Sequence, residues 1–345
     1  MKRISAFTML AASAAVTPLA LAAQETLYFS GYAGDFQRVF EAEIAPDFEA
    51  AHGVDIVYVP GNSSSTIAKL QAQANNQEIS VALVDNGPMQ MAMQFGLCDS
   101  VTNTVAFGDL YDMAKPEAFD GKAVGIGLVA TGITYNKAKF DREGWAAPTS
   151  WNDLIEDKFE NRVTSNSITG TFGLNALLMF AQMNGGSEEN IEPGFEAIQE
   201  RLAPNVVTWT SSNAEMAQLF QNGDIDIGVW GSNRANALKD TGFPVEFVYP
   251  NEGAPAIIAS ACAVAGSPQP DLAQELLKYL VSPKVQKKLA TQGFGPTNRA
   301  VTLDADIAET VPYGEDKLAK MISMDWEVIN ANRADWAKRW VRTIE

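Results

Sequence analysis

Residues 54–73, VDIVYVPGNSSSTIAKLQAQ, contain a strand, a turn and the start of a helix. The first six residues are rich in β-branched side chains and end at Pro-Gly-Asn, which predicts a β-strand followed by a tight turn. Ser63, Ser64 and Ser65 then precede a helix-like run, where one hydroxyl side chain is enough to cap the helix N-terminus. The spare hydroxyls predict either a pocket for an anion or polar ligand at this partly positive helix end, or a flexible loop with one cap.

Strands and helices alternate along the rest of the chain. Helix-like runs with apolar residues at helical spacing include 172–186, 211–223 and 271–282. Short, β-branched runs bounded by Gly, Pro or Asn predict strands at 54–59, 79–85, 123–136, 161–165, 205–210, 224–230, 245–250 and 254–266. This order predicts an α/β architecture with largely parallel sheets, in which ligands bind at the carboxyl ends of strands. Because no long linker separates the parts, we expect the chain to cross between two lobes within strands.

The first residues predict export. Lys2 and Arg3 precede an apolar, Ala-rich run, and an A-x-A cleavage site ends at Ala22, so residues 1–22 are expected to be a secretory signal peptide. No Cys lies near this site to carry a lipid, and no later run is long and apolar enough to span a membrane. We therefore expect a soluble periplasmic protein, and the about 323 residues left after removing 22 from 345 are enough for two lobes.

Charge and rare residues exclude several functions. The formal net charge of −17 disfavours binding to nucleic acid or to anionic membranes. His52 is the only histidine and lies where a helix is expected to end, which removes most nucleophile–base triads and all multi-histidine metal sites. No CxxC, HExxH, P-loop or GxGxxG motif is present. We expect no catalysis, cofactor or metal.

The two cysteines leave two interpretations open. Cys98 ends a helix-like stretch and Cys262 lies in an apolar run. An oxidising compartment permits a disulfide between them. Two buried free thiols explain the residues equally well.

The segment 276–298, LLKYLVSPKVQKKLATQGFGPTN, carries a family resemblance. It contains a helix, then Ser-Pro, then a second helix with proline at its first position, and it ends in Gly-Phe-Gly-Pro-Thr-Asn. This order resembles the late segment of extracellular solute-binding proteins of ABC importers. Four other stretches resemble elements of that family. Residues 131–140 resemble its hinge-crossing strand, and residues 148–163 resemble a helix entry. Residues 249–264 resemble its return crossing, and residues 325–340 resemble its C-terminal docking helix. The resemblance covers nearly the whole chain after the signal peptide. The chain looks most like the type II class that includes polyamine, ferric-ion, thiamine and phosphonate or sugar-phosphate binders.

This resemblance implies a two-lobed type II periplasmic binding protein fold that closes on its ligand. Lobe 1 would hold 24–128 and 256–302, and lobe 2 would hold 132–248. The hinge would consist of crossing strands at 129–131 and 249–255, and C-terminal helices in 303–345 would pack across the lobes. The implied partners are an inner-membrane ABC permease and its ATPase, with the protein itself a monomer. A sensory binding protein would use the same cleft and remains an alternative.

Candidate ligand contacts lie where strands meet helix starts. Polar residues follow the strand at 79–85, and Thr-Gly-Thr at 169–171 repeats the hydroxyl pattern in the second lobe. The alternatives are helix caps for the polar residues, core positions for the tryptophans, a hinge brace for Glu252 and a solvated position for Arg234. The predicted ligand contacts are Tyr32, Ser63, Ser64, Ser65, Asp85, Asn86, Thr131, Thr169, Gly170, Thr171, Trp209, Ser211, Trp230, Ser232, Asn233 and Glu252.

These residue types favour an anionic or zwitterionic solute. Polyamine binders of the resembled class set several carboxylates around the ligand, whereas GAPAIIAS after Glu252 and Thr-Gly-Thr contain none. The adjacent tyrosines of ferric-ion binders are missing after Trp230. A phosphonate, phosphorylated, thiamine-like or carboxylated amine compound fits the hydroxyls and helix ends. Polyamine binding stays the alternative, because Asp85, Glu252 and the tryptophans could together form a cation site.

Overall fold

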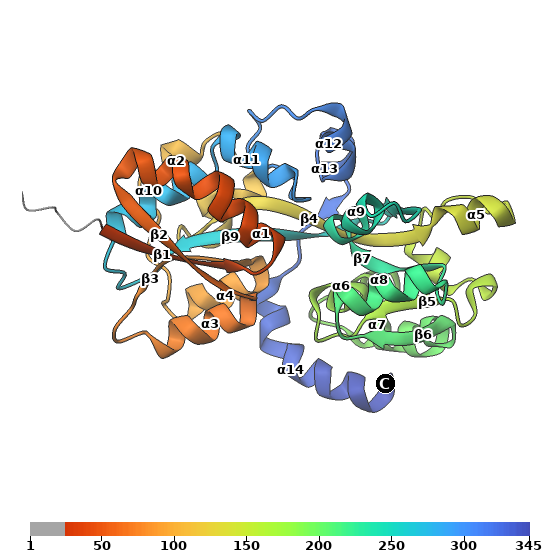
Figure 1. Ribbon diagram of the computed structural model, residues 1–345. Helices are drawn as coiled ribbons and strands as arrows, with labels where there is room; N and C mark the ends of the chain where they lie inside the picture. The colour runs from red at the N-terminus through yellow and green to blue at the C-terminus, as the bar shows by residue number, and fades with distance from the viewer. Residues whose placement is uncertain (1–24) are drawn as a thin grey trace, which may run out of the picture.

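The computed structural model describes residues 25–345, so the predicted signal peptide lies outside the described residues. Two β-sheets share one long strand, β4 (Val124–Asn136). Helices flank each sheet, and the two resulting lobes lie on either side of the middle of β4 (Figure 1). The α/β class and the two-lobed architecture predicted from the sequence are confirmed.

Lobe 1 is built on parallel strands followed by antiparallel crossing strands. The sheet order is β2–β1–β3–β9–β4, with β1, β2 and β3 parallel and β9 antiparallel to both β3 and β4. Its strands are β1 (Glu25–Tyr32), β2 (Val54–Gly61), β3 (Ile79–Asp85), β9 (Ala254–Ala263) and the first half of β4. Its helices are α1 (Asp35–Val39), α2 (Ala45–His52), α3 (Ser63–Ala72), α4 (Asn86–Gln94), α10 (Pro270–Leu280) and α11 (Pro283–Ala290).

Lobe 2 repeats this arrangement with the second half of β4. The sheet order is β4–β7–β5–β6, with β5 parallel to β6 and β7, and β8 on the other side of β4. Its strands are β5 (Val163–Asn166), β6 (Val206–Thr210), β7 (Ile227–Gly231) and β8 (Val245–Val248). Its helices are α5 (Lys137–Glu143), α6 (Thr171–Met183), α7 (Glu192–Ala197), α8 (Asn213–Asn222) and α9 (Ser232–Asp240).

The long strand β4 changes partner within one residue. Ala130 pairs with Ala256 of β9 in lobe 1, and the next residue, Thr131, pairs with Gly231 of β7 in lobe 2. Because β4 carries the chain out of lobe 1 and β9 brings it back, the two run in opposite directions. The sheets are therefore mixed, and the prediction of largely parallel sheets was wrong for the crossing strands.

The C-terminal helix α14 (Trp326–Thr343) contacts both lobes (Figure 1). Trp326 lies directly against Gly87 of α4, and Asn330 Nδ2 donates to the Gly87 carbonyl at 2.9 Å. Trp336 and Trp340 are buried in the apolar core of lobe 2. The preceding segment forms α12 (Ala305–Thr310), α13 (Glu315–Leu318) and β10 (Met321–Ile322), which pairs with β9.

A disulfide joins Cys98 to Cys262, with 5.7 Å between their Cα atoms. It ties the segment after α4 to β9 within lobe 1, and so it decides between the two interpretations left open by the sequence. Within residues 25–345, no helix combines the length and the apolar character that spanning a bilayer requires.

Candidate ligand-binding site

A cavity of about 730 Å³ lies between the two lobes. In each lobe the parallel strands end at one edge of the sheet, and a helix begins after each strand there. Val129 of β4 and Ile257 and Ala259 of β9 line the cavity where the crossing strands pass. The volume falls within the roughly 300–1,000 Å³ typical of small-molecule sites.

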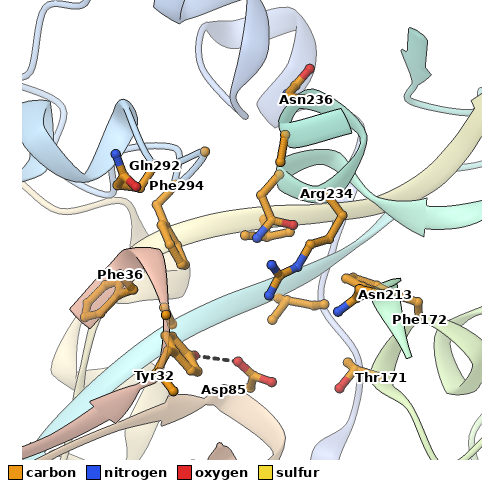
Figure 2. Close-up of a pocket in the computed structure, with 18 of the residues that line it drawn as sticks. Tyr32, Phe36, Asp85, Thr171, Phe172, Asn213, Arg234, Asn236, Gln292 and Phe294 are labelled. Atoms are coloured by element: carbon orange, nitrogen blue, oxygen red, sulfur yellow. Dashed lines mark hydrogen bonds between the residues drawn. The ribbon is translucent and has the colours of Figure 1, made fainter. Parts of the chain in front are cut away.

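Asp85, at the end of β3, is the acidic group on the lobe 1 side. The Tyr32 hydroxyl donates to Asp85 Oδ1 at 2.5 Å (Figure 2). The Asp85 backbone N–H donates to Ser63 Oγ at 3.1 Å. Burial raises the pKa of Asp85, while hydrogen bonds from Tyr32 and Ser63 and the charge of Arg234 oppose this rise. Burial and the neighbouring carboxyl raise the pKa of Tyr32 well above its ordinary value, so its hydroxyl remains a donor.

Three aromatic rings stand beside this carboxyl group. The ring centroids of Tyr32 and Phe36 are 5.5 Å apart, those of Phe36 and Phe294 5.6 Å, and those of Tyr32 and Phe294 6.2 Å. The rings pack against one another and together form one wall of the cavity (Figure 2). We call Tyr32, Phe36 and Phe294 the aromatic wall. Because aromatic faces attract cations, this wall and Asp85 favour a positively charged group on the lobe 1 side.

The lobe 2 side is formed by the starts of α6, α8 and α9. The N-cap residues of α6 and α9 are Gly170 and Gly231, and neither helix receives a side-chain cap. Their first-turn N–H groups therefore receive no side-chain cap, at helix ends that carry a partial positive charge. In α8 the side chain of Ser212 already caps the helix, accepting from the Glu215 N–H at 3.2 Å.

Arg234 supplies a full positive charge on the same side. It is the third residue of α9, and its guanidinium lies in the middle of the cavity view, between the two lobes (Figure 2). The side chain is exposed and, among the described residues, has no hydrogen-bond or ion-pair partner within contact distance. A guanidinium presents a planar fork of N–H donors that matches the geometry of a carboxylate or phosphate.

Asn213, the first residue of α8, adds an oriented donor. Its Oδ1 accepts a hydrogen bond from the indole nitrogen of Trp230 at 2.8 Å. Because an indole N–H can only donate, this bond fixes the amide and leaves Nδ2 for the cavity. Trp230 itself is only 2 % exposed and belongs to the core of lobe 2. The Asn213 amide and the Arg234 guanidinium are therefore donors on the lobe 2 wall, and they suit a negatively charged or oxygen-rich group.

Several residues predicted from the sequence line the cavity. They are Tyr32, Asp85, Gly170, Thr171, Ser211 and Asn233. Arg234, for which the sequence favoured a solvated position, lines the cavity too. Their contact with a ligand stays a prediction.

The serines that follow β2 have separate roles. Asn62, not a serine, is the N-cap of α3, and it forms a reciprocal capping box with Ser65. Ser63 accepts from the Asp85 N–H and so supports the acidic group from behind. Ser64 is exposed and does not line the cavity. The loop thus matches the capping interpretation at Ser65, and it contributes to the cavity through Asp85.

Other predicted contacts lie behind the cavity, around the crossing strands. Asn86 Oδ1 accepts from the Ile258 N–H at 3.3 Å, and Thr131 Oγ1 accepts from Asn175 Nδ2 at 2.7 Å. Ser232 Oγ accepts from the Ala130 N–H at 3.2 Å. These three polar side chains are buried and hold the crossing strands to the helices beside them.

The remaining predicted contacts lie farther out. Trp209 packs edge-on against Trp340 of α14, with centroids 4.8 Å apart. Glu252 accepts hydrogen bonds from the Ser150 hydroxyl and the Trp151 N–H. Thr169 is exposed and precedes the cavity-lining Gly170.

The sequence interpretation missed Phe36, Phe172, Phe294 and Asn213. Phe172 packs against the apolar cores of both lobes, so it joins the two walls. Two signals were present in the sequence: Phe294 lies in the Gly-Phe-Gly-Pro-Thr-Asn stretch of the resemblance, and Asn213 follows Ser211 and Ser212.

Three relatives align with large parts of the chain. An uncharacterized protein of Haemophilus influenzae is 25% identical over 309 residues, which cover 86% of this chain and 85% of that protein. The spermidine/putrescine-binding periplasmic protein of Salmonella typhimurium is 27% identical over 173 residues, or 50% of this chain and 48% of that protein. The thiamine-binding periplasmic protein of Salmonella typhimurium is 27% identical over 221 residues, covering 61% of each. The chain thus aligns with less than two thirds of the two relatives with named ligands.

Solved structures share the fold. The structure of an ABC transporter protein from Clostridium perfringens superposes with a TM-score of 0.82 at 23% identity, covering 92% of this chain and 100% of that one. The periplasmic binding protein AfuA of Actinobacillus pleuropneumoniae, solved with fructose-6-phosphate, superposes with a TM-score of 0.73 at 20% identity, covering 93% and 99%. At these identities the likeness establishes the fold alone.

The family follows from a match that spans most of the chain. Residues 43–313 match the family described as bacterial extracellular solute-binding protein. The relatives with named ligands are periplasmic binding proteins rather than enzymes, so the predicted class, the location outside the cytoplasm and the non-enzymatic role are confirmed. The chain belongs to the bacterial extracellular solute-binding proteins.

Proposed function

We propose that the protein serves import and captures a small polar organic solute, anionic or zwitterionic, in the cavity between its lobes. Phosphonates, phosphorylated compounds, thiamine-like compounds and carboxylated amines belong to this class. The observation that carries the proposal is the lobe 2 wall, where uncapped helix starts lie beside Arg234, which forms no ion pair within residues 25–345. The proposed partners are an inner-membrane permease and its ATPase, with the protein acting as a monomer.

The groups next to the ligand favour a solute with an anionic end, although the chain as a whole is acidic. The chain carries a formal net charge of −17, which by itself attracts cations. Charges beyond about 8–10 Å are largely screened at physiological salt, so the groups that touch the ligand decide its charge. On the lobe 2 side those groups are helix N–H donors, the Asn213 amide and the Arg234 guanidinium.

Polyamine binding is the second candidate. Asp85 and the aromatic wall form a cation-attracting surface, and some relatives are named for spermidine and putrescine. A diamine needs an acidic partner for each of its ends. On the lobe 2 side the lining carboxylate is Asp240, which lies six residues after Arg234 and so about 9 Å farther along α9. This arrangement favours the anionic or zwitterionic solute.

We also propose that the lobes have the boundaries predicted from the sequence, with hinges at 129–131 and 249–255. The change of partner of β4 between Ala130 and Thr131 supports the first hinge. Contacts of Glu252 with Ser150 and Trp151 support the second, because they tie the return crossing to lobe 2. Bending there would bring the two walls of the cavity together around a ligand.

A thermal-shift panel tests the proposed function. A ligand that binds only the native state raises the melting temperature. We expect a large rise with an anionic or zwitterionic solute and little change with spermidine, putrescine or ferric ion. A large rise with a polyamine that Asp85→Asn abolishes would instead establish the second candidate.

A further inference from the structure

Two oppositely charged side chains line the cavity from different lobes: Asp85 belongs to lobe 1 and Arg234 to lobe 2 (Figure 2). Arg38 of lobe 1, which has an interaction of its own, and Asp240 at the end of α9 line the cavity as well. Burial raises the pKa of Asp85, and the Arg234 charge opposes part of this rise. Asp85 and Arg234 are not in contact: among the described residues, Arg234 forms no ion pair with any carboxylate. A ligand can therefore enter between the two charges.

The lobe 1 side is suited to an ammonium group. The Asp85 carboxyl group is held in place by the Tyr32 hydroxyl on one oxygen and by Ser63 at its backbone. The aromatic wall stands next to it, and aromatic rings stabilise a nearby cation by roughly 0.5–2 kcal/mol. A group with one positive charge satisfies both features.

The lobe 2 side is suited to an oxyanion. Arg234 donates through a planar fork, Asn213 Nδ2 is oriented by Trp230, and the N-terminal N–H groups of α6 and α9 are uncapped. All of these groups donate hydrogen bonds, and the carboxylate that lines the cavity on this side, Asp240, lies at the far end of α9.

The floor between the two sides is apolar. Val129 of β4 and Ile257 and Ala259 of β9 line it, and each is at most 6 % exposed. A buried apolar floor stabilises methylene groups and offers no partner to a charged or hydroxylated middle part of the ligand. The preferred ligand therefore has its charges at its two ends and a short aliphatic chain between them.

We propose that the solute is a short aliphatic zwitterion with an ammonium group at one end and an oxyanion, carboxylate or phosphonate, at the other. The ammonium group binds Asp85 beside the aromatic wall, and the oxyanion binds Arg234 and Asn213. This inference rests on the proposed function, because it concerns the same cavity, and it narrows the solute to one class. It also assigns orientation: the positive end faces lobe 1 and the negative end faces lobe 2.

Probes matched in chain length and differing only in their ends test this inference by calorimetry. They are ω-amino carboxylates from β-alanine to 6-aminohexanoate, the α,ω-diamines and the dicarboxylates of equal length, and the short ω-amino phosphonates. We expect the tightest zwitterion to bind at least tenfold more tightly than the diamine and the dianion of its own length. Comparing carboxylates with phosphonates identifies the oxyanion.

Variants assign each end of the ligand to its wall. Arg234→Gln should weaken the zwitterion and the dianion at least tenfold and leave the diamine unchanged. Asp85→Asn should weaken the zwitterion and the diamine and leave the dianion unchanged. Asp55→Asn, which removes an exposed carboxylate of β2 outside the cavity, is the matched control and should change each affinity less than twofold. Arg234 is exposed and has no ion-pair partner in the described part of the chain, so its variant should fold even if Asp85→Asn does not.

The outcomes separate this inference from the proposed function. If a diamine or a dianion binds most tightly, or if Arg234→Gln leaves zwitterion affinity unchanged, the inference is overturned while capture of a small solute in the cavity stands. The same holds if only a sugar phosphate or a thiamine-like compound binds. If none of these compounds binds, the proposed function fails together with the inference.

Discussion

At the scale of single residues, the types of side chain in the cavity could be predicted better than which individual residues line it. The sequence identified Asp85 and Thr171, and the structure places both on the cavity wall. It also identified Trp209 and Trp230, which end strands as cavity residues often do, yet both pack into the protein. A strand end has two faces, and which face a tryptophan takes depends on distant partners such as Trp340. Those partners cannot be inferred from local sequence.

The Thr171 hydroxyl, at the first position of α6, tests the lobe 2 wall. A hydrogen bond to a charged ligand group contributes about 1.5–3 kcal/mol, so Thr171→Ala should weaken binding about ten- to a hundredfold. Ser64→Ala is the control, because Ser64 is exposed and lies off the cavity, and it should leave affinity unchanged. Calorimetry on both variants decides this, and equal affinities would assign Thr171 a purely structural role.

Asp85 should lower the stability of the ligand-free protein at neutral pH. Burial raises the pKa of Asp85 in the folded protein above its value in the unfolded chain. The free energy of unfolding is therefore highest below the unfolded pKa, where the carboxyl group is protonated, and it falls as pH rises through the folded pKa. Asp85→Asn removes this loss and can still accept from Tyr32. We expect its melting temperature to exceed that of the wild type at pH 7, with the difference vanishing below about pH 4. Scanning calorimetry showing a less stable variant at pH 7 would contradict this.

At the scale of elements, runs with strong local signals could be predicted, and long-range pairing could not. The run at 79–85 coincides with β3, and proline begins α11 as expected. β1 was missed because Thr26, Ser30 and Gly31 interrupt its apolar character. Its burial comes from pairing on both sides with β2 and β3, and Ser30 is satisfied by Thr66 at 3.1 Å. These partners lie far away along the chain.

The glycine N-caps of α6 and α9 should differ in their tolerance of a methyl group. A Cβ at Gly231 would lie 2.3 Å from the Phe172 ring, whereas the nearest atom to a Cβ at Gly170 is 3.4 Å away. Gly231→Ala must therefore displace Phe172 at the cavity, and we expect it to weaken ligand binding at least tenfold. Gly170→Ala is the matched control and should bind within about threefold of the wild type. Equal losses in the two variants, measured by calorimetry, would refute the assignment of Phe172 to the binding site.

At the scale of the whole molecule, the two lobes are joined by β4 and β9 and by α14, which packs on both. The resemblance of single segments was enough to predict this architecture, because the crossing strands and the docking helix each have a recognisable sequence. The arrangement of charged side chains in the cavity could not be predicted as well from the sequence. It depends on Asp85, Arg234 and the aromatic wall, which come from separate parts of the chain and meet only in the folded protein.

Ligand binding should make the molecule more compact. A solute that touches both walls stabilises the closed arrangement by its differential affinity for that state. We expect the radius of gyration from small-angle scattering to fall when a saturating ligand is added, and Arg234→Gln, which lacks the lobe 2 contact, to need far more ligand for the same change. Superimposable curves with and without saturating ligand would contradict the proposed hinges at 129–131 and 249–255.

The most direct test of the account is a crystal structure of protein purified without denaturation and carrying its own solute or the tightest zwitterion of the matched series. The account predicts one small molecule between the lobes, with its positive end within hydrogen-bond distance of Asp85 and its negative end on Arg234 and Asn213. A ligand bound in the reverse orientation, held by one lobe alone or located outside this cavity would contradict it.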